Sequence, residues 1–260
     1  MSLSRNSFLT VTLATVVWLA VPARAADPDL ILYLKLDAAS GTAAVDSSGL
    51  ANNGTVVAGV NGPDWVTGHR GGALLFEGLT STGARYIQVP WHTSLRVTTG
   101  LTVMAWLKLT GTDNDEQTLV GRAESTDWQL ELHANDKRIP FSVVVGSSRR
   151  TLTATIPGAG LSAGTWYHVA GTYDGSRLRV YLDGVELGNS ACTGTVNVSS
   201  NASLPLGVGA LVEAVGEWEH AFPGTLDEVK IWKRALTAAE IVDEMNAGAS
   251  FTRLQWRENF

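Results

Sequence analysis

Cysteine, charge and long apolar runs are all scarce in this chain of 260 residues. Cys192 is the one cysteine, so no disulfide within the chain can hold the fold together. Charged residues make up 17%, and 19 basic against 25 acidic residues give a net charge of −6. Such a surface repels phosphate groups, which argues against a nucleic-acid partner. Hydrophobic residues still make up 45%, which excludes wholesale disorder and allows a globular core.

Several catalytic signatures are absent as well. The sequence has no phosphate-binding glycine loop. Its five histidines form no pair with zinc-ligand spacing on one element.

Residues 1–25 have the pattern of an export signal. Arg5 makes a basic start, residues 8–21 are largely apolar, and Ala23 and Ala25 are the small residues that a signal peptidase recognises. The apolar run is shorter than the roughly 20 residues that span a bilayer, which disfavours a membrane anchor. No later stretch is apolar enough to span. We therefore expect a secreted protein, extracellular or periplasmic, with 17 basic and 25 acidic residues after cleavage.

Apolar and polar residues alternate with a period of two through the rest of the chain, which is typical of half-buried strands. Two Asp-Gly pairs, at 174–175 and 183–184, predict tight turns in a meander over residues 166–187. Regular spacing of such strands predicts an all-β sandwich of two antiparallel sheets, each of about 6–7 strands. The predicted strands cover residues 30–36, 73–76, 86–89, 101–109, 118–121, 128–133, 138–145, 151–156, 167–173, 177–182, 204–207 and 225–232.

One helix is predicted, near the end of the chain. Thr237 and Glu240 have the spacing of a capping box, Ile241 and Met245 share a helix face, and Gly248 ends the pattern. We find no linker or internal repeat. The simplest organisation is one domain over residues 26–248, followed by an unassigned tail at 249–260.

Six segments, in order and at plausible spacing, resemble laminin-G-like jelly-roll domains of the concanavalin A-like lectin/glucanase superfamily. They are residues 46–49 (DSSG) with 53–54 (NG), 71–78 (GGALLFEG), 101–107 (LTVMAWL), 166–175 (WYHVAGTYDG), 180–184 (VYLDG) and 222–241 (FPGTLDEVKIWKRALTAAEI). The resemblance implies a concanavalin A-like jelly roll with a short C-terminal helix. It does not fix the function, because this fold carries sugar-binding, adhesion, assembly, hydrolase and lyase activities.

A structural calcium ion is implied by the same resemblance, since relatives hold one with a late-strand aspartate and oxygens near the domain start. Asp227 takes the first role, and Asp46 and Asn53, with the Gly54 carbonyl, take the second. Asp227 has the strand parity of Val229 and Ile231, so it is expected to be buried and to need compensation. The alternative is that Asp46 makes an Asx turn and Asp227 caps its own hairpin.

Gln129, Glu131 and His133 follow one strand on its polar side and are the candidate catalytic residues of a lyase or hydrolase. Arg149 or Arg179 would lie opposite. The alternative is an ordinary solvated face, which strand alternation alone produces. Relatives that hydrolyse glucans carry a Glu-x-Asp-x-Glu strand, which is absent here, and Glu131 is the single carboxylate on its strand.

Aromatic residues in loops are the candidate ligand contacts, namely Trp91, His92 and Trp218. Exposed rings stack on sugars, although loop aromatics also serve as lids on a core. The leading hypothesis is an exported, non-catalytic module that binds carbohydrate or an extracellular protein, with a structural calcium. The alternatives are a polysaccharide lyase or glycoside hydrolase acting from the concave sheet face, and a structural module of a surface assembly.

Overall fold

The computed structural model describes residues 27–58, 62–78, 83–111, 116–123, 127–198, 204–214 and 217–247. The predicted export signal at 1–25, the predicted tail at 249–260 and Gly248 lie outside the described residues. Among the helices within these ranges, none has the length and apolar character needed to cross a membrane.

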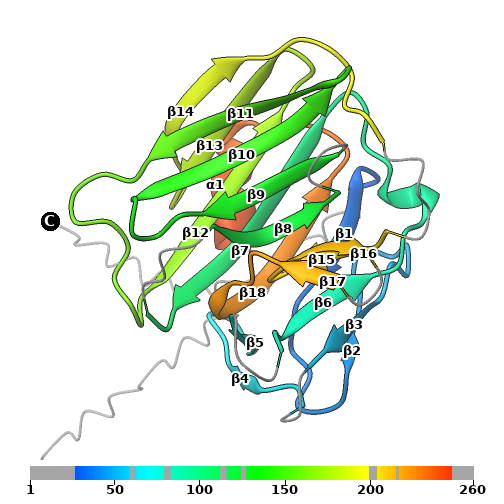
Figure 1. Ribbon diagram of the computed structural model, residues 1–260, viewed down its shortest axis with the longest axis vertical. Helices are drawn as coiled ribbons and strands as arrows, with labels where there is room; N and C mark the ends of the chain where they lie inside the picture. Colours follow the sequence, from blue (N-terminus) through cyan, green and yellow to red (C-terminus); the bar gives the residue numbers. More distant parts are fainter. Residues whose placement is uncertain are drawn as a thin grey trace, which may run out of the picture.

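Two antiparallel sheets of eight strands each form the sandwich (Figure 1). The front sheet, which faces the viewer in Figure 1, runs in the order β11 (Ser148–Thr155), β10 (Arg138–Val145), β9 (Trp128–Leu132), β8 (Gln117–Arg122), β15 (Leu206–Val208), β6 (Tyr86–Val89), β3 (Gly54–Val57) and β2 (Ala43–Ala44). The predicted two-sheet jelly roll is confirmed. Each sheet exceeds the predicted number because short strands such as β2 and β3 give no alternation long enough to recognise.

The second sheet, which we call the helix sheet, runs in the order β14 (Val185–Ala191), β13 (Arg177–Leu182), β12 (Trp166–Tyr173), β7 (Leu101–Leu109), β18 (Pro223–Trp232), β5 (Gly72–Glu77) and β4 (Trp65–Thr67), and β1 (Leu30–Leu34) also pairs with β18. The strands β12, β13 and β14 form the predicted meander. A separate hairpin joins β16 (Leu211–Ala214) to β17 (Glu217–Glu219).

The core lies between the two sheets and is built from the inward residues of the alternating strands. Leu130 and Phe141 of the front sheet and Val103 and Val169 of the helix sheet have no exposed surface. The sheets approach closely at Gly171, where a Cβ atom would lie 2.6 Å from the Phe141 ring. Any larger residue there would force β12 away from β10, so this glycine sets the distance between the sheets.

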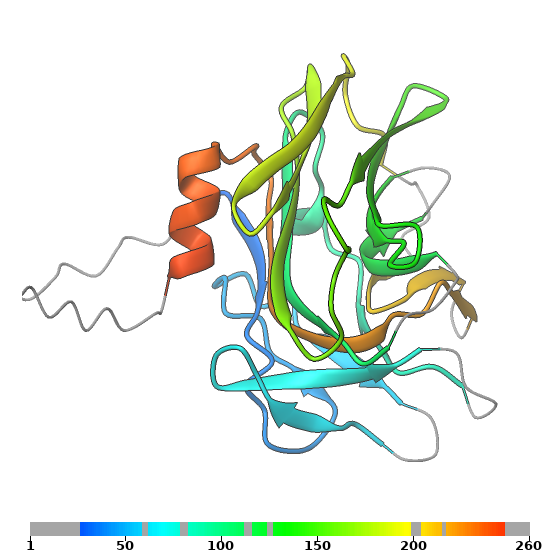
Figure 2. The same ribbon diagram turned by 90° about the vertical axis from the view of Figure 1, so that its left-hand side faces the viewer.

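The helix α1 (Ala238–Asn246) packs on the outer face of the helix sheet, away from the front sheet (Figure 2). Ile241 of the helix joins Leu236, Met104 and Trp232 in a buried cluster there. The predicted capping box is present, because Thr237 Oγ1 accepts a hydrogen bond from Glu240 N and the Glu240 carboxylate accepts one from Thr237 N. A short 3-10 helix, η1, covers Thr93–Leu95.

Replacement of Thr237 by alanine should lower the free energy of unfolding by about 1 kcal/mol, since it removes the helix cap. The thermal midpoint should then fall by about 2–4 °C for a domain of this size. The matched control is Thr237→Ser, which keeps the hydroxyl group and should melt close to the wild type. Equal midpoints for the alanine and serine variants would contradict the assigned cap.

Candidate functional site

The outer face of the front sheet carries a buried polar row on β9. Gln129 and Glu131 point away from the core because Leu130, between them in the sequence, points into it. They are only 1% and 4% exposed, so the alternative of an ordinary solvated face is wrong. Arg149 of β11 donates hydrogen bonds to both, to Gln129 Oε1 and, at 3.0 Å, to Glu131 Oε2. The other arginine considered, Arg179, pairs instead with an aspartate of its own hairpin.

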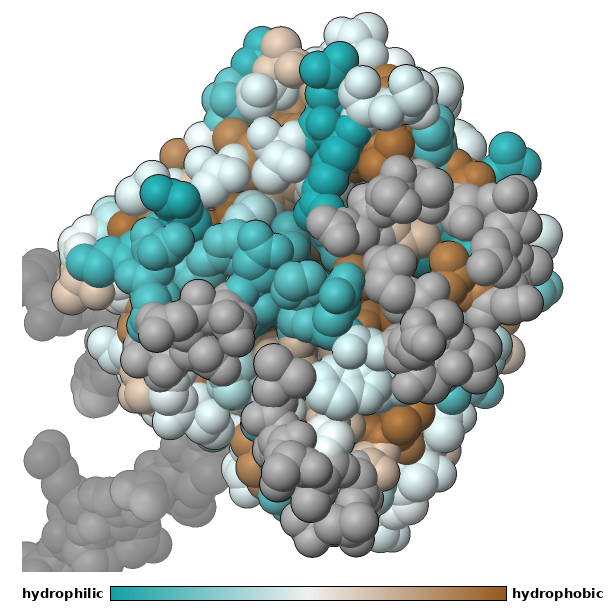
Figure 3. Space-filling view, viewed as in Figure 1, coloured by the Kyte–Doolittle hydropathy of each residue, from teal (hydrophilic) through white to brown (hydrophobic). Residues whose placement is uncertain are grey.

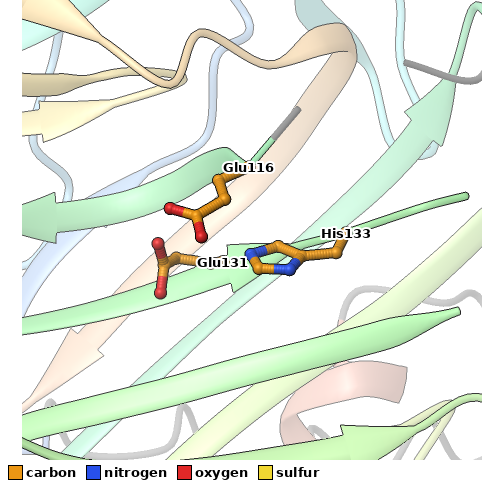
Figure 4. A group of neighbouring side chains, drawn as sticks. All are labelled: Glu116, Glu131 and His133. Carbon is orange, nitrogen blue, oxygen red and sulfur yellow. The ribbon is translucent and has the colours of Figure 1, made fainter. Parts of the chain in front are cut away.

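The neighbouring strand β8 supplies a second polar row that the sequence did not reveal. Thr118 pairs directly with Glu131 across the two strands, and the same pairing continued by one residue sets Glu116 opposite His133. Ligand atoms of Glu116, Glu131 and His133 all lie within 4.8 Å of one another (Figure 4). Glu131 is therefore the single carboxylate of its strand, but it has a second carboxylate beside it.

We call this set the front-sheet cluster. Its members are Glu116, Thr118, Gln129, Glu131, His133 and Arg149. Figure 3 shows hydrophilic side chains gathered in a band across this face of the molecule. The cluster has an exposed rim, where the Glu116 side chain is 53% exposed, and a buried floor formed by Thr118, Gln129 and Glu131.

A bulge in β8 makes this arrangement possible. The pairing with β9 shifts by one residue between Thr118 and Val120, so Thr118 faces outward while Val120 faces the core. Without the shift the two residues would share a face, because residues two apart on a strand lie on the same side. Because of the bulge, β8 contributes side chains both to the polar cluster and to the hydrophobic core.

Three buried atoms of the cluster have no hydrogen-bond partner among the described residues, namely Thr118 Oγ1, Gln129 Nε2 and His133 Nε2. Burial lowers the pKa of His133, and the nearby Glu116 and Asp136 carboxylates oppose that shift. The floor of the cluster thus holds hydrogen-bonding capacity that the described residues do not use.

Asp227, the predicted calcium ligand, lies on the helix sheet. Its side chain leaves that sheet on the outer face, whereas the prediction put it on the core face. The pairing of β18 shifts between Asp227 and Lys230, and Glu228 between them has a φ of 52°. This bulge leaves Val229 in the core and turns Asp227 to the helix side of its sheet, where it pairs with Trp106. The predicted shared face with Val229 and Ile231 is wrong because the alternation breaks at the bulge.

The Asp227 carboxylate is fully buried, and one of its two oxygens has a hydrogen-bond partner among the described residues. Its Oδ2 accepts a hydrogen bond from Arg70 N at 2.8 Å, while its Oδ1 has no partner among the described residues. Burial is the largest cause that raises the pKa of Asp227 to about 7, and the neighbouring Glu228 and Asp37 carboxylates add to the shift. Asp227 is therefore poised either to be protonated or to meet a cation.

Asp46 makes the Asx turn that was the alternative to calcium binding. Its Oδ1 accepts from Tyr33 N and Ser48 N, and its Oδ2 accepts from Ser48 Oγ and Asn52 N. The Asn53 side-chain oxygen accepts from Asp46 N at 2.8 Å. The oxygens of both predicted ligands are thus used to hold the loop in shape.

The predicted calcium ligands do not converge on one site. The strand β1 lies between β18 and the Asp46 loop. On one side its Leu34 pairs with Val229 of β18, and on the other side Leu34 forms a β-bridge with Asp46. Strands in a sheet are about 4.8 Å apart, so the Asp46 and β18 backbones are separated by about 10 Å. Asp46 and Asn53 therefore do not fit the calcium site that the family resemblance implies, and Asp227 is the one predicted ligand with an unused buried oxygen.

The predicted aromatic contacts are divided between two places. Trp91 is half-buried and packs on the buried Arg122 side chain, whose guanidinium carbon lies 3.8 Å from the ring centre. His92 is exposed and caps η1, with its Nδ1 accepting from Ser94 N. Trp218 of β17 is half-buried against a small cluster under its own hairpin. Trp91 and Trp218 therefore serve mainly as lids on apolar surface.

A hollow of about 280 Å³ brings Trp91 and His92 together with residues 50–53. Its central amide, Asn52, is already occupied by the chain, since Asn52 Oδ1 accepts from Ser94 Oγ and Nδ2 donates to Ile31 O. The front-sheet cluster, in contrast, keeps buried polar atoms that no residue in the described part of the chain partners. We therefore take the cluster as the candidate site.

Comparison with known proteins places the chain in a known family. A family model described as the concanavalin A-like lectin/glucanases superfamily matches residues 81–242. Over 170 residues the chain is 26% identical to mouse pappalysin-1, and this match covers 59% of the chain and 10% of pappalysin-1. The chain thus spans about a tenth of the length of the curated relatives that it matches.

Solved structures with the same fold include the binding domain of paraclostridial mosquitocidal protein 1, with a TM-score of 0.65 and 15% identity over 84% of this chain and 52% of that one. Domain 4 of AbnA, an extracellular GH43 arabinanase from Geobacillus stearothermophilus solved in complex with arabinotriose, has a TM-score of 0.61 and 21% identity over 83% of this chain and 98% of that one. Likeness at this level of identity shows the fold alone.

Replacement of Asp227 by asparagine should change how stability depends on pH. Because folding raises the pKa of this carboxyl to about 7, the wild type is favoured while the group is protonated and loses stability as the pH rises from about 4 through 7. The variant lacks this titration. The difference between its melting midpoint and that of the wild type should therefore shift by several degrees in favour of the variant when the pH is raised from 5 to 8.

The matched control is Asp64→Asn, the same change at an exposed position. Its midpoint should follow the wild type at both pH values. A constant difference between the wild type and Asp227→Asn at pH 5 and pH 8 would show that Asp227 is not held at a raised pKa.

Proposed function

The chain belongs to the concanavalin A-like lectin/glucanases superfamily, and on that premise we propose that it is a non-catalytic module that binds carbohydrate through the outer face of its front sheet. The observation that carries the proposal is the front-sheet cluster, where charged side chains lie beside a buried floor in which Thr118 Oγ1 and Gln129 Nε2 have no hydrogen-bond partner among the described residues. A carbohydrate presents many hydroxyl groups, each able to donate and to accept a hydrogen bond.

The chemistry of the rim suits such a ligand. Arg149 offers several donors in one plane, and Glu116 offers acceptor oxygens. The ion pair between Arg149 and Glu131 holds the guanidinium in place before a ligand arrives, which reduces the ordering cost of binding. Unpaired buried polar atoms cost about 1–3 kcal/mol each, so a ligand or ordered water that meets them is favoured.

Similar folds support a binding role. The arabinanase domain solved with arabinotriose and the toxin binding domain share the sandwich with this chain. We extend the proposal to export by residues 1–25, on the strength of their basic start, apolar run and small residues at 23 and 25. An extracellular protein as partner, or a role in a surface assembly, would be indicated by a failure to bind any sugar.

Structural calcium remains a prediction, and it now involves Asp227 without Asp46 or Asn53. The buried, unpartnered Asp227 Oδ1 is the feature in its favour. In the melting experiment above, added calcium at pH 8 should raise the wild-type midpoint and leave Asp227→Asn unchanged, whereas a chelator without effect on the wild type would argue against it.

A catalytic alternative has one specific observation in its favour, the approach of Glu116 to Glu131. Glycoside hydrolases act with two carboxyl groups, about 5–5.5 Å apart in retaining enzymes. The Glu131 carboxylate, however, is almost fully buried and already engaged in the ion pair with Arg149. We therefore favour binding without turnover.

Arg149→Gln should weaken binding of the carbohydrate identified on a glycan array of plant, animal and algal sugars by about tenfold or more, because it removes charge-assisted hydrogen bonds. The matched control is Arg150→Gln, the next residue on β11, whose side chain leaves the strand on the opposite face. Calorimetry measures both affinities. The proposed site would be contradicted if no sugar on the array bound, or if both variants lost the same affinity.

Glu131→Gln tests the catalytic alternative. We expect the wild-type protein to bind polysaccharide without releasing shorter products, so the variant should differ in affinity alone. Product release from acidic polysaccharides is measured by reducing ends and by absorbance of unsaturated sugars. Turnover by the wild type that falls 100-fold or more in Glu131→Gln would replace the binding proposal with an enzyme.

A further inference from the structure

Two strands of the front sheet bring an imidazole and two carboxylates to one point. Glu131 and His133 are two apart on and just after β9 and therefore share a face, and the pairing of β8 with β9 sets Glu116 on the same face. One ligand atom from each lies within 4.8 Å of the others, and Figure 4 shows the two carboxylates and the imidazole ring converging.

A second, independent observation comes from a neutral side chain. Thr118 has no exposed surface, and its Oγ1 has no hydrogen-bond partner among the described residues. The direct pairing of Thr118 with Glu131 turns this hydroxyl group toward the same face as the three side chains. An unused oxygen thus lies buried beside the point where the carboxylates and imidazole meet.

We propose that Glu116, Glu131 and His133 form a binding site for a divalent first-row transition metal ion of the Zn²⁺ class. Imidazole and carboxylate ligands together suit such ions, whereas Ca²⁺ and Mg²⁺ take oxygen ligands. Three protein ligands leave a coordination position open, which Thr118, water or an external ligand can fill. The site is separate from the predicted calcium ligand Asp227, which lies on the helix sheet.

Closure of the site needs a modest movement. Two ligands about 2.1 Å from a tetrahedral ion lie about 3.4 Å apart, which is closer than the 4.8 Å bound on the separations here. Glu116 can supply the movement, because its side chain is 53% exposed and free to change rotamer, while Glu131 is buried. Metal binding would thus move the Glu116 side chain toward Glu131 and His133.

Two neighbouring side chains set limits on the affinity. Arg149 lies 3.0 Å from Glu131 Oε2, and the His220 ring lies 3.8 Å from Glu116 Oε2. A guanidinium repels a cation and competes for the same carboxylate. Removal of the Arg149 charge should therefore strengthen metal binding, in contrast to the loss of carbohydrate binding expected for the same variant.

The test uses the untagged chain, freed of metal by a chelator and then titrated with Zn²⁺ in a calorimeter. We expect one ion per chain. His133→Gln and Glu116→Gln should each weaken binding by at least tenfold. The control His92→Gln, an exposed histidine beside Trp91 at the opposite end of β8, should bind as the wild type does.

Circular dichroism and melting midpoints without metal establish that each variant is folded, and Glu116→Gln alters an exposed side chain that should not affect folding. Absence of one-to-one binding by the wild type, or equal binding by the wild type and both cluster variants, overturns the metal site. The inference does not rest on the proposed carbohydrate role. Arg149→Gln separates the two, because a loss of sugar binding with retained or tighter Zn²⁺ binding supports both.

Discussion

One extra residue in β8 determines which side chains reach the outer face of the front sheet. Before the bulge, Thr118 faces outward opposite Glu131, and after it Val120 faces the core opposite Leu130. A slip of one residue moves every side chain of a strand to the other face. The candidate site therefore depends on backbone pairing at one position, and its side chains are held there by the same core that the bulge preserves.

The helix sheet uses the same device. In β18 the bulge at Glu228 keeps Val229 in the core and turns Asp227 outward, although the two are only two residues apart. Both bulges lie in long or central strands that cannot shift without breaking the core. Polar groups are thus fixed in buried positions on the outer faces of both sheets, at points where regular alternation would have put them elsewhere.

The sequence was informative wherever the chain is regular. Alternation alone placed Gln129 and Glu131 on one face of a strand, turn chemistry located the meander, and the capping box located the helix at Thr237. It could not find Glu116 or Thr118, since the pairing of two strands depends on register and on a bulge that leaves no signature in either strand. It misplaced Asp227 for the same reason.

The two roles proposed for the front-sheet cluster make opposite demands on Arg149. A sugar hydroxyl or acidic group gains from a guanidinium held 3.0 Å from Glu131, while a cation at Glu131 is repelled by it. Glu131 is buried and cannot turn away from either. Any metal bound there must therefore displace Arg149 or weaken its contact with Glu131. The ion pair between Arg149 and Glu131 is thus the contact through which metal binding and carbohydrate binding would influence each other.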